Sequence, residues 1–183
     1  MNWFNAIAIL IVVYLAVFAQ ATFNELRQWI GVKIDLLPSL VVYASLSSGV
    51  VTLSLVAVCG GLWFDSLSAN PLGTSILPLF LTGLFIQRSR DMILREQPFA
   101  QFVLGTLAST AVPFLALLLL LNFSEQPLVS WFSLWQWLVM SLVGGAVTPI
   151  WFGVFDRIRE ALNYRPLGET SFRPDREIKR GRQ

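Results

Sequence analysis

Five stretches of this sequence contain no charged side chain over about the length that a membrane-spanning helix needs. They are residues 3–23, 36–64, 66–87, 98–122 and 128–155. A helix crosses a bilayer core of about 30 Å with about 20 predominantly apolar residues. Charged residues make up only 13% of the chain, whereas a soluble domain carries about 25%. So few charges cannot cover a globule of this size with a hydrated surface, and the sequence predicts an integral membrane protein.

The charged residues gather at the C-terminal end. Residues 156–183 hold 8 Lys or Arg and 5 Asp or Glu, whereas the other 155 residues hold 5 and 6. We therefore predict a transmembrane domain at 1–163 and a polar, basic cytoplasmic tail at 164–183. The net charge of +2 is modest, and it does not indicate binding to nucleic acid.

We predict an all-α bundle of six short transmembrane helices. The run 36–64 would make a single helix of about 43 Å at about 1.5 Å per residue, so we expect the cluster Ser47, Ser48 and Gly49 to divide it. Pro38 fits the first turn of a helix, where its missing N–H costs little. The helices are expected at 3–23, 36–46, 50–64, 71–87, 98–122 and 128–155, and the last one continues past the membrane. A five-helix arrangement and a signal peptide at 3–23 are the alternatives.

Lys and Arg predict the orientation, because the cytoplasmic loops of membrane proteins are enriched in them. They follow the fourth predicted helix and fill the tail, whereas the connections 65–72 and 123–130 contain none. We therefore expect both termini in the cytoplasm. Arg27 and Lys33 disagree with this arrangement, because they fall in a loop that it places outside.

Several chemistries are missing from the sequence. It contains no His, which excludes a Ser-His-Asp triad and a His-ligated metal. The single Cys, Cys59, cannot form an intrachain disulfide and fits a small buried side chain. There is no Gly-rich phosphate loop followed by Lys, and no second Asp accompanies Asp65 inside the apolar runs. We therefore expect no enzyme activity, no catalytic residue, no metal and no cofactor.

Asp65 is the acidic residue of greatest interest, because it lies between two apolar runs. A carboxylate at membrane depth is a functional candidate by default, yet the helix dipole disfavours an acid at the C-terminus of a helix. We expect Asp65 to accept backbone N–H groups of the next segment, at 66–68 or at 73–75, and so to fix an outer hairpin. Pro71 suits the first position of the following helix. A proton or ligand site at Asp65 is the alternative.

Small residues recur at four-residue spacing in three of the predicted helices. Such pairs let helix backbones approach closely in lipid, either within the bundle or against a partner's helix. Prolines inside two helices are expected to kink them and so to shape a groove. The candidate residues for helix packing or a partner groove are Pro38, Ala57 (paired with Gly61), Gly105 with Ser109, Pro113, Ser141 with Gly145, and Pro149.

A run of motifs between Pro38 and Gly73 is typical of one family. A short helix begun by proline is followed by a Ser-Ser-Gly break, a Gly-Gly-Leu-Trp-Phe-Asp run and a Pro-Leu-Gly turn. In this order they resemble the rod shape-determining protein MreD family, in which a Gly-rich third helix ends in Asp before a Pro-Leu-Gly turn. Family members often carry basic residues where this chain has Ser-Ser-Gly. The resemblance assigns a hairpin motif to Gly60, Gly61, Asp65, Pro71 and Gly73.

The resemblance implies a fold like that of the substrate-binding S-components of ECF vitamin transporters, in the bacterial inner membrane. It implies a non-catalytic scaffold of the elongasome that binds the bitopic protein MreC and helps position lateral peptidoglycan synthesis to maintain rod cell shape. The indirect partners would be MreB, RodA and a penicillin-binding transpeptidase, with membrane lipid around the protein. The alternative is a genuine S-component. Those typically carry an Ala-x-x-x-Ala pattern on the first helix, which residues 3–23 lack.

Overall fold

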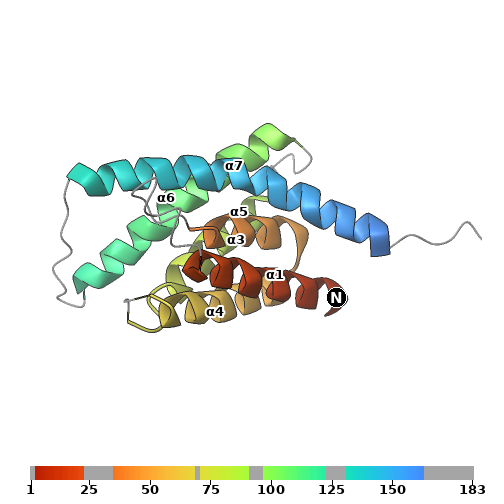
Figure 1. Cartoon of the computed structure of the whole chain (residues 1–183), viewed down its shortest axis with the longest axis horizontal. Coiled ribbons are helices and arrows are strands. Elements are labelled where there is room, and N and C mark those ends of the chain that lie inside the picture. The colour runs from red at the N-terminus through yellow and green to blue at the C-terminus, as the bar shows by residue number, and fades with distance from the viewer. Residues whose placement is uncertain (1–2, 23–34, 69–70, 91–96, 123–130, 163–183) are drawn as a thin grey trace, which may run out of the picture.

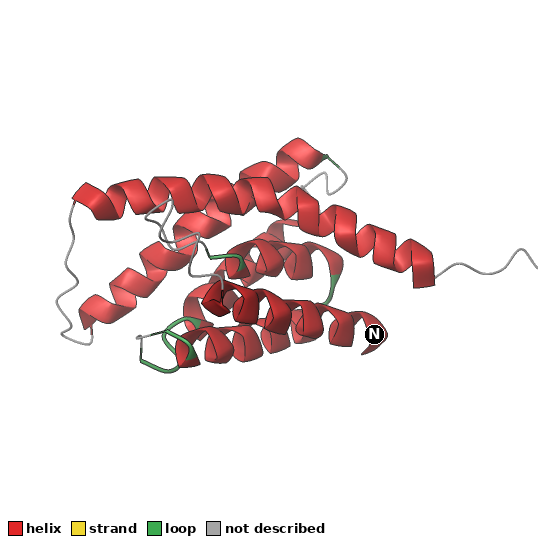
Figure 2. Ribbon diagram, in the orientation of Figure 1, coloured by secondary structure: helices red, strands yellow, loops and turns green. Residues whose placement is uncertain are grey.

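The computed structural model describes residues 3–22, 35–68, 71–90, 97–122 and 131–162. These residues form six α-helices and no strand, which confirms the predicted all-α class (Figure 2). The helices are α1 (Trp3–Thr22), α3 (Leu37–Ser47), α4 (Val50–Ser66), α5 (Ile76–Ser89), α6 (Pro98–Asn122) and α7 (Trp131–Leu162). The predicted tail at 164–183 lies outside the described residues.

Two of these helices, α6 and α7, are long and apolar enough to cross a membrane. The segments concerned are Pro98–Asn122 and Ser133–Ile158, and only 22% and 33% of their most apolar windows are buried inside the structure. α3 has 11 residues and α5 has 14, which is fewer than the roughly 20 that a full crossing takes. The structure thus supports the coarse prediction of a membrane protein, and six crossings stay a prediction.

Large apolar side chains cover the outside of the bundle, and hydroxyl groups lie inside it. The exposed apolar side chains include Ile11, Leu15 and Phe18 on α1, Val58 and Leu62 on α4, Phe85 on α5, Leu107 on α6, and Leu142 and Ile150 on α7. The buried hydroxyl residues include Ser39, Ser45, Thr52, Thr82, Ser109 and Thr148. Contiguous exposed apolar surface on this scale is typical of a lipid-facing or protein-binding surface, and it suits a helix bundle in a bilayer.

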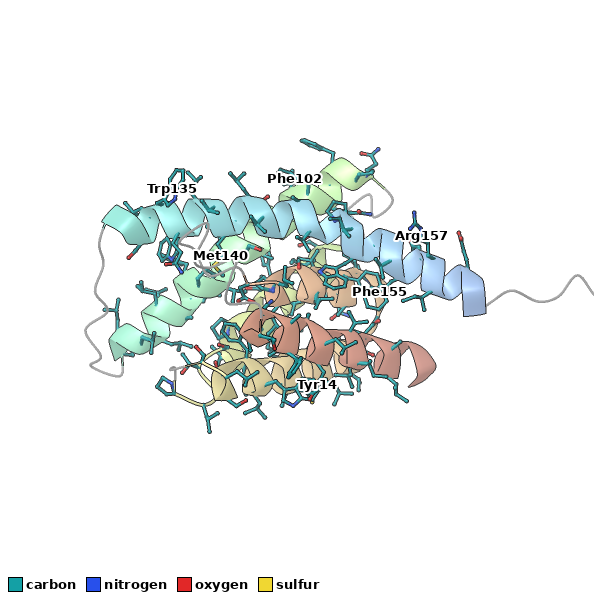
Figure 3. All side chains as sticks on the ribbon, viewed as in Figure 1. Tyr14, Phe102, Trp135, Met140, Phe155 and Arg157 are labelled. Atoms are coloured by element: carbon teal, nitrogen blue, oxygen red, sulfur yellow. The ribbon has the colours of Figure 1, made fainter. Side chains whose placement is uncertain are left out.

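The short helix α3 lies at the centre of the structure. Its residues Leu37 to Leu46 are all buried, and it contacts α1, α4, α5, α6 and α7. The ring of Tyr43, which is fully buried, stacks on Phe155 of α7 with centroids 4.1 Å apart and meets Phe152 edge-on at 5.0 Å. Figure 3 shows Phe155 on the side of α7 that faces α3. These rings hold the C-terminal part of α7 against the central helix.

The predicted break between the second and third helices is present. α3 begins where Asp35 Oδ1 accepts a hydrogen bond of 2.9 Å from the backbone N–H of Leu37, and Pro38 lies in its first turn, as expected. The chain then turns at Ser48, whose carbonyl accepts a 3.2 Å bond from Gln87 Nε2 of α5. This bond places the C-terminus of α5 beside the α3–α4 break.

The predicted start of the fourth helix is wrong. We expected that helix to begin at Pro71, whereas α5 begins at Ile76. The Pro71 carbonyl accepts the N–H of Thr74 at 3.3 Å, and Gly73 takes a φ of 94°. A residue with positive φ cannot continue a right-handed helix, so the turn displaces the helix start.

The two long helices cross one another (Figure 1). α7 continues past Phe155 to Leu162, as predicted, and its predicted start at 128 lies outside the described residues. Pro113 and Pro149 both lie inside helices. α7 changes direction partway along its length in Figure 1. A proline removes one backbone hydrogen bond and so allows such a bend.

Replacing Phe155 by leucine tests how α7 is held. We expect Phe155→Leu to lower the free energy of unfolding by about 1–2 kcal/mol, because leucine loses the ring that stacks on Tyr43. Denaturant titration in detergent micelles measures the change. Phe85→Leu is the control, because Phe85 is 76% exposed, and its expected change is about 0–0.5 kcal/mol. An unchanged Phe155→Leu protein would show that this stack does not hold α7.

Candidate functional site

The Asp65 carboxylate organises the connection between α4 and α5. The residue is 1% exposed. Its Oδ2 accepts the backbone N–H groups of Gly73 at 2.8 Å and of Ser75 at 3.1 Å, and its Oδ1 accepts the Ser75 hydroxyl at 2.5 Å. Hydrogen bonds to an ionised acceptor are among the stronger ones in proteins. The buried acid is therefore held by the hairpin that it closes.

The local sequence explains why the donors reach the carboxylate. A Cβ at Gly61 would come within 3.1 Å of the backbone N and Cα of Ile76, so glycine lets the first residue of α5 lie directly against α4. Gly73 supplies the positive φ that turns its own N–H and that of Ser75 toward Asp65. Gly60 packs in the same close way, since a Cβ there would lie 3.0 Å from Val13 of α1.

Of the two donor segments that the sequence suggested, residues 66–68 and 73–75, the carboxylate accepts hydrogen bonds from 73–75. Ser66 instead donates its hydroxyl to the Trp63 carbonyl at 2.8 Å, and the N–H of Ser68 bonds the backbone carbonyl of Asp65 at 3.1 Å. These three hydrogen bonds to the carboxylate all come from its own hairpin. This geometry favours a structural role over a site that exchanges a proton or a ligand.

The second close arrangement is the crossing of α6 and α7. A Cβ at Gly105 would overlap Thr148 Oγ1 and come within 2.9 Å of the Gly144 carbonyl oxygen. A Cβ at Gly144 would overlap Ser109 Oγ. Thr148 is fully buried and donates its hydroxyl to the Gly144 carbonyl at 2.7 Å. The two backbones are in direct contact here, as small residues at four-residue spacing allow.

The neighbouring turn of α7 extends the crossing. A Cβ at Gly145 would overlap Thr106 Oγ1 and lie 3.0 Å from the Phe102 carbonyl oxygen. Ser141, its predicted pair, is half-buried and donates its hydroxyl to Leu138 of its own helix at 2.9 Å. The small residues Gly105, Ser109 and Gly145 are therefore buried between two helices of this chain rather than presented to a partner.

The other predicted packing residues occupy several places. Ala57 is fully buried in α4. Pro38 is buried in the first turn of α3, whereas Pro113 and Pro149 are half-buried in α6 and α7. Pro71 is exposed in the hairpin turn. The structure thus places some candidates in the hairpin and others at the α6–α7 crossing, leaves Pro38 and Ala57 in the core of α3 and α4, and does not join them into one site.

Sequence reasoning missed several residues that the structure makes important. Gly144 and Thr148 are four apart, so the spacing rule that identified Gly105 could have found them. Gly83 needs close packing, because a Cβ there would lie 2.5 Å from Leu53, and an isolated glycine in a helix usually has such a reason. Asp35, which is 6% exposed, accepts the N–H of Leu37 two residues on, the turn that an Asp side chain often makes with its own backbone.

Buried hydroxyl groups without a hydrogen bond lie on several of the described helices, among them α5 and α6. Thr82 of α5 and Ser109 of α6 are 8% and 1% exposed, and neither side-chain oxygen has a partner. Within the part of the chain that the structure describes, no group of three His, Cys, Asp or Glu residues could hold a metal ion. The buried polar groups of the described interior thus include hydroxyls and the two hydrogen-bonded carboxylates of Asp35 and Asp65.

Comparisons with protein-family models, with curated proteins and with solved structures found no match to this chain.

Proposed function

We propose that this protein is a non-catalytic membrane scaffold of the kind found in the MreD family. In this role it binds a bitopic MreC-type protein and helps to position lateral peptidoglycan synthesis, which maintains rod cell shape. MreB, RodA and a penicillin-binding transpeptidase are its indirect partners. The observation that carries the proposal is the packed helix bundle with apolar side chains exposed along five of its helices, because such a surface can bind both lipid and another membrane helix.

The Asp65 hairpin supports the same proposal. The motif that resembles the family runs from Gly60 to Gly73, and its acid, glycines and turn meet in one hydrogen-bonded unit. The unit fixes the relative positions of α4 and α5. A scaffold needs a defined shape more than it needs a reactive group, and this hairpin supplies one.

The proposed placement is six crossings of a bacterial inner membrane with both termini in the cytoplasm. The bond from Gln87 to Ser48 puts the C-terminus of α5 at the α3–α4 break, so Arg88 and Arg90 lie at that end of the bundle. The Asp65 hairpin joins the other ends of α4 and α5. Since Arg marks the cytoplasmic side, the hairpin faces outward. Inserting an alkaline phosphatase reporter at residues 69–70 tests this, because the reporter is active only outside the cytoplasm.

Depletion and co-purification test the scaffold itself. We expect rods to lose their shape when the protein is depleted, and we expect an MreC-type protein to co-purify with the tagged chain from detergent-solubilised membranes. The matched control is an unrelated six-helix membrane protein carrying the same tag. Normal rods after depletion, together with the absence of the partner from the purified sample, would refute the scaffold.

The second candidate is a solute-binding S-component of a vitamin transporter. It is favoured by the unpaired hydroxyls of Thr82 and Ser109 in the interior, because a polar solute could bond to such groups. Isothermal titration of the purified protein with a vitamin panel tests it. Submicromolar binding that falls in a Thr82→Val protein would favour this function over the scaffold.

A further inference from the structure

The outer surfaces of the neighbouring helices α1 and α4 expose large apolar side chains, and together they are here named the α1–α4 face. Four side chains of α1 and two of α4 on it are between 40% and 56% exposed: Ile7, Ile11, Leu15, Phe18, Val58 and Leu62. The two helices are in contact. Figure 3 shows Tyr14 on this side of the molecule.

Polar groups interrupt this apolar face at its centre. Tyr14 is 50% exposed, and its ring packs edge-on against Trp63 with centroids 5.2 Å apart and stacks beside Phe18 at 6.5 Å. Within the described part of the chain, neither the Tyr14 hydroxyl nor the Trp63 indole N–H makes a hydrogen bond. The ring contacts hold the Tyr14 side chain in place while its hydroxyl stays available.

The exposed hydroxyl groups elsewhere on the bundle behave differently. Those of Ser54, Thr110 and Ser141 each donate to a carbonyl of their own helix, at distances of 2.9, 2.8 and 2.9 Å. A serine or threonine can do so because its hydroxyl lies close to the backbone of the preceding turn. The hydroxyl of Tyr14 stands at the far end of a rigid ring and cannot reach its own backbone.

In the proposed six-crossing placement, Tyr14 lies at a depth where lipid offers its hydroxyl no hydrogen-bond acceptor. It is the twelfth of the 20 residues of α1, so its Cα is about 17 Å from the start of a helix about 30 Å long. Acyl chains at this depth contain no hydrogen-bond acceptor, and an unsatisfied polar group there is unfavourable. A lipid-covered α1–α4 face would leave the phenol unpaired, whereas a protein helix could supply an acceptor.

We propose that the α1–α4 face binds a membrane-spanning helix of a partner protein that presents a hydrogen-bond acceptor at the depth of Tyr14. The acceptor is a Ser or Thr hydroxyl or a backbone carbonyl, and the flanking apolar side chains pack beside it. The inference rests on the proposed scaffold function and identifies its binding face. The small residues of the α6–α7 crossing are not available for this purpose, because Gly105 and Gly145 are buried against the opposite helix.

Removing one oxygen atom tests the proposal. Tyr14→Phe keeps the ring contacts with Trp63 and Phe18 and deletes only the hydroxyl. Loss of one hydrogen bond between membrane helices should lower the affinity for the co-expressed MreC-type partner by about 3-fold, and at most by about 18-fold. The control is Thr110→Val on α6, which removes an exposed hydroxyl that is bonded inside its own helix. Because no bond between helices is lost, the affinity for the partner should stay within about 1.5-fold of wild type.

Photocrosslinking identifies the bound face independently of that change. A photoreactive amino acid at Ile11, Leu15 or Phe18 should crosslink to the partner, whereas one at Leu107 of α6 or Phe85 of α5 should not. All five positions are exposed, so accessibility does not separate them. The full-length protein is used in every case, in membranes from cells that co-express the partner.

The possible outcomes are distinct. Two outcomes would refute binding at the α1–α4 face and leave the scaffold function intact. One is crosslinking of the partner from α6 or α5 alone. The other is crosslinking of α1 to lipid alone, together with normal partner binding by the Tyr14→Phe protein. If no partner co-purifies with the wild-type protein, the scaffold function fails, and this proposal fails with it. Partner crosslinks confined to α1 together with weaker binding by Tyr14→Phe support it.

Discussion

Replacing Asp65 by alanine is expected to lower the free energy of unfolding by about 3–5 kcal/mol, because an unpaired buried donor costs about 1–3 kcal/mol and more than one is left. The N–H groups of Gly73 and Ser75 lose their acceptor, and so does the Ser75 hydroxyl. The α4–α5 hairpin then keeps only the local bonds of its turn, such as those from Thr74 to the Pro71 carbonyl, and loses its link to α4 through Asp65. Denaturant titration in detergent micelles, followed by tryptophan fluorescence, measures the loss.

Two further variants separate the charge from the shape of Asp65. Asp65→Asn keeps one acceptor oxygen but presents an NH₂ group to donors, so we expect an intermediate loss of about 2 kcal/mol. Asp156→Asn is the control for removing a negative charge, because Asp156 is exposed. If Asp65→Asn unfolded like wild type but lost partner binding or cell-shape function, Asp65 would serve as a reactive site rather than as the anchor of a hairpin.

Replacing Gly105 by alanine is expected to lower the free energy of unfolding by about 2–3 kcal/mol, the usual range for inserting a methyl group into a filled contact. The new Cβ overlaps the Thr148 hydroxyl and lies 2.9 Å from the Gly144 carbonyl oxygen. Thr148 is fully buried, and the carbonyl belongs to a helix backbone, so neither can move aside locally. The two helices must separate along the crossing.

Gly153→Ala provides the matched control for that change. A Cβ at Gly153 has nothing within 4 Å, and alanine in place of glycine in a helix is favourable by about 0.5–1 kcal/mol. We expect this variant to be as stable as wild type or slightly more stable under the same denaturant titration. Equal behaviour of the Gly105 and Gly153 variants would mean that the α6–α7 crossing is not close-packed in solution.

The hairpin shows how far sequence reasoning extends. An acid at the end of an apolar helix needs donors, and the following glycine-containing segment was one of two that could supply them. Which segment does so depends on where the chain turns, and Gly73 decides that through its positive φ. A propensity argument placed Pro71 at a helix start, whereas the tertiary hydrogen bonds to Asp65 hold it in the turn.

The α6–α7 crossing shows the limit of spacing rules. Four-residue spacing marked Gly105 and Ser109 as a contact surface, but spacing cannot tell an internal neighbour from an external partner. In the structure, Gly105 and Ser109 of α6 pack against α7, where Gly144 and Thr148 contact them. The same assignment removes them from the set of surfaces open to another protein.

The sequence by itself determined the helical class and the positions of most helices, because charge-free apolar runs and their breaks act locally along the chain. It also showed that most of the Lys and Arg residues gather at the C-terminal end of the chain. Only the tertiary structure decided that the short α3 is the buried centre, that α6 and α7 meet backbone to backbone, and that Tyr14 is left with a free hydroxyl on an apolar face. These features depend on which helices become neighbours, and neighbour identity is set by the simultaneous packing of all of them rather than by any one segment.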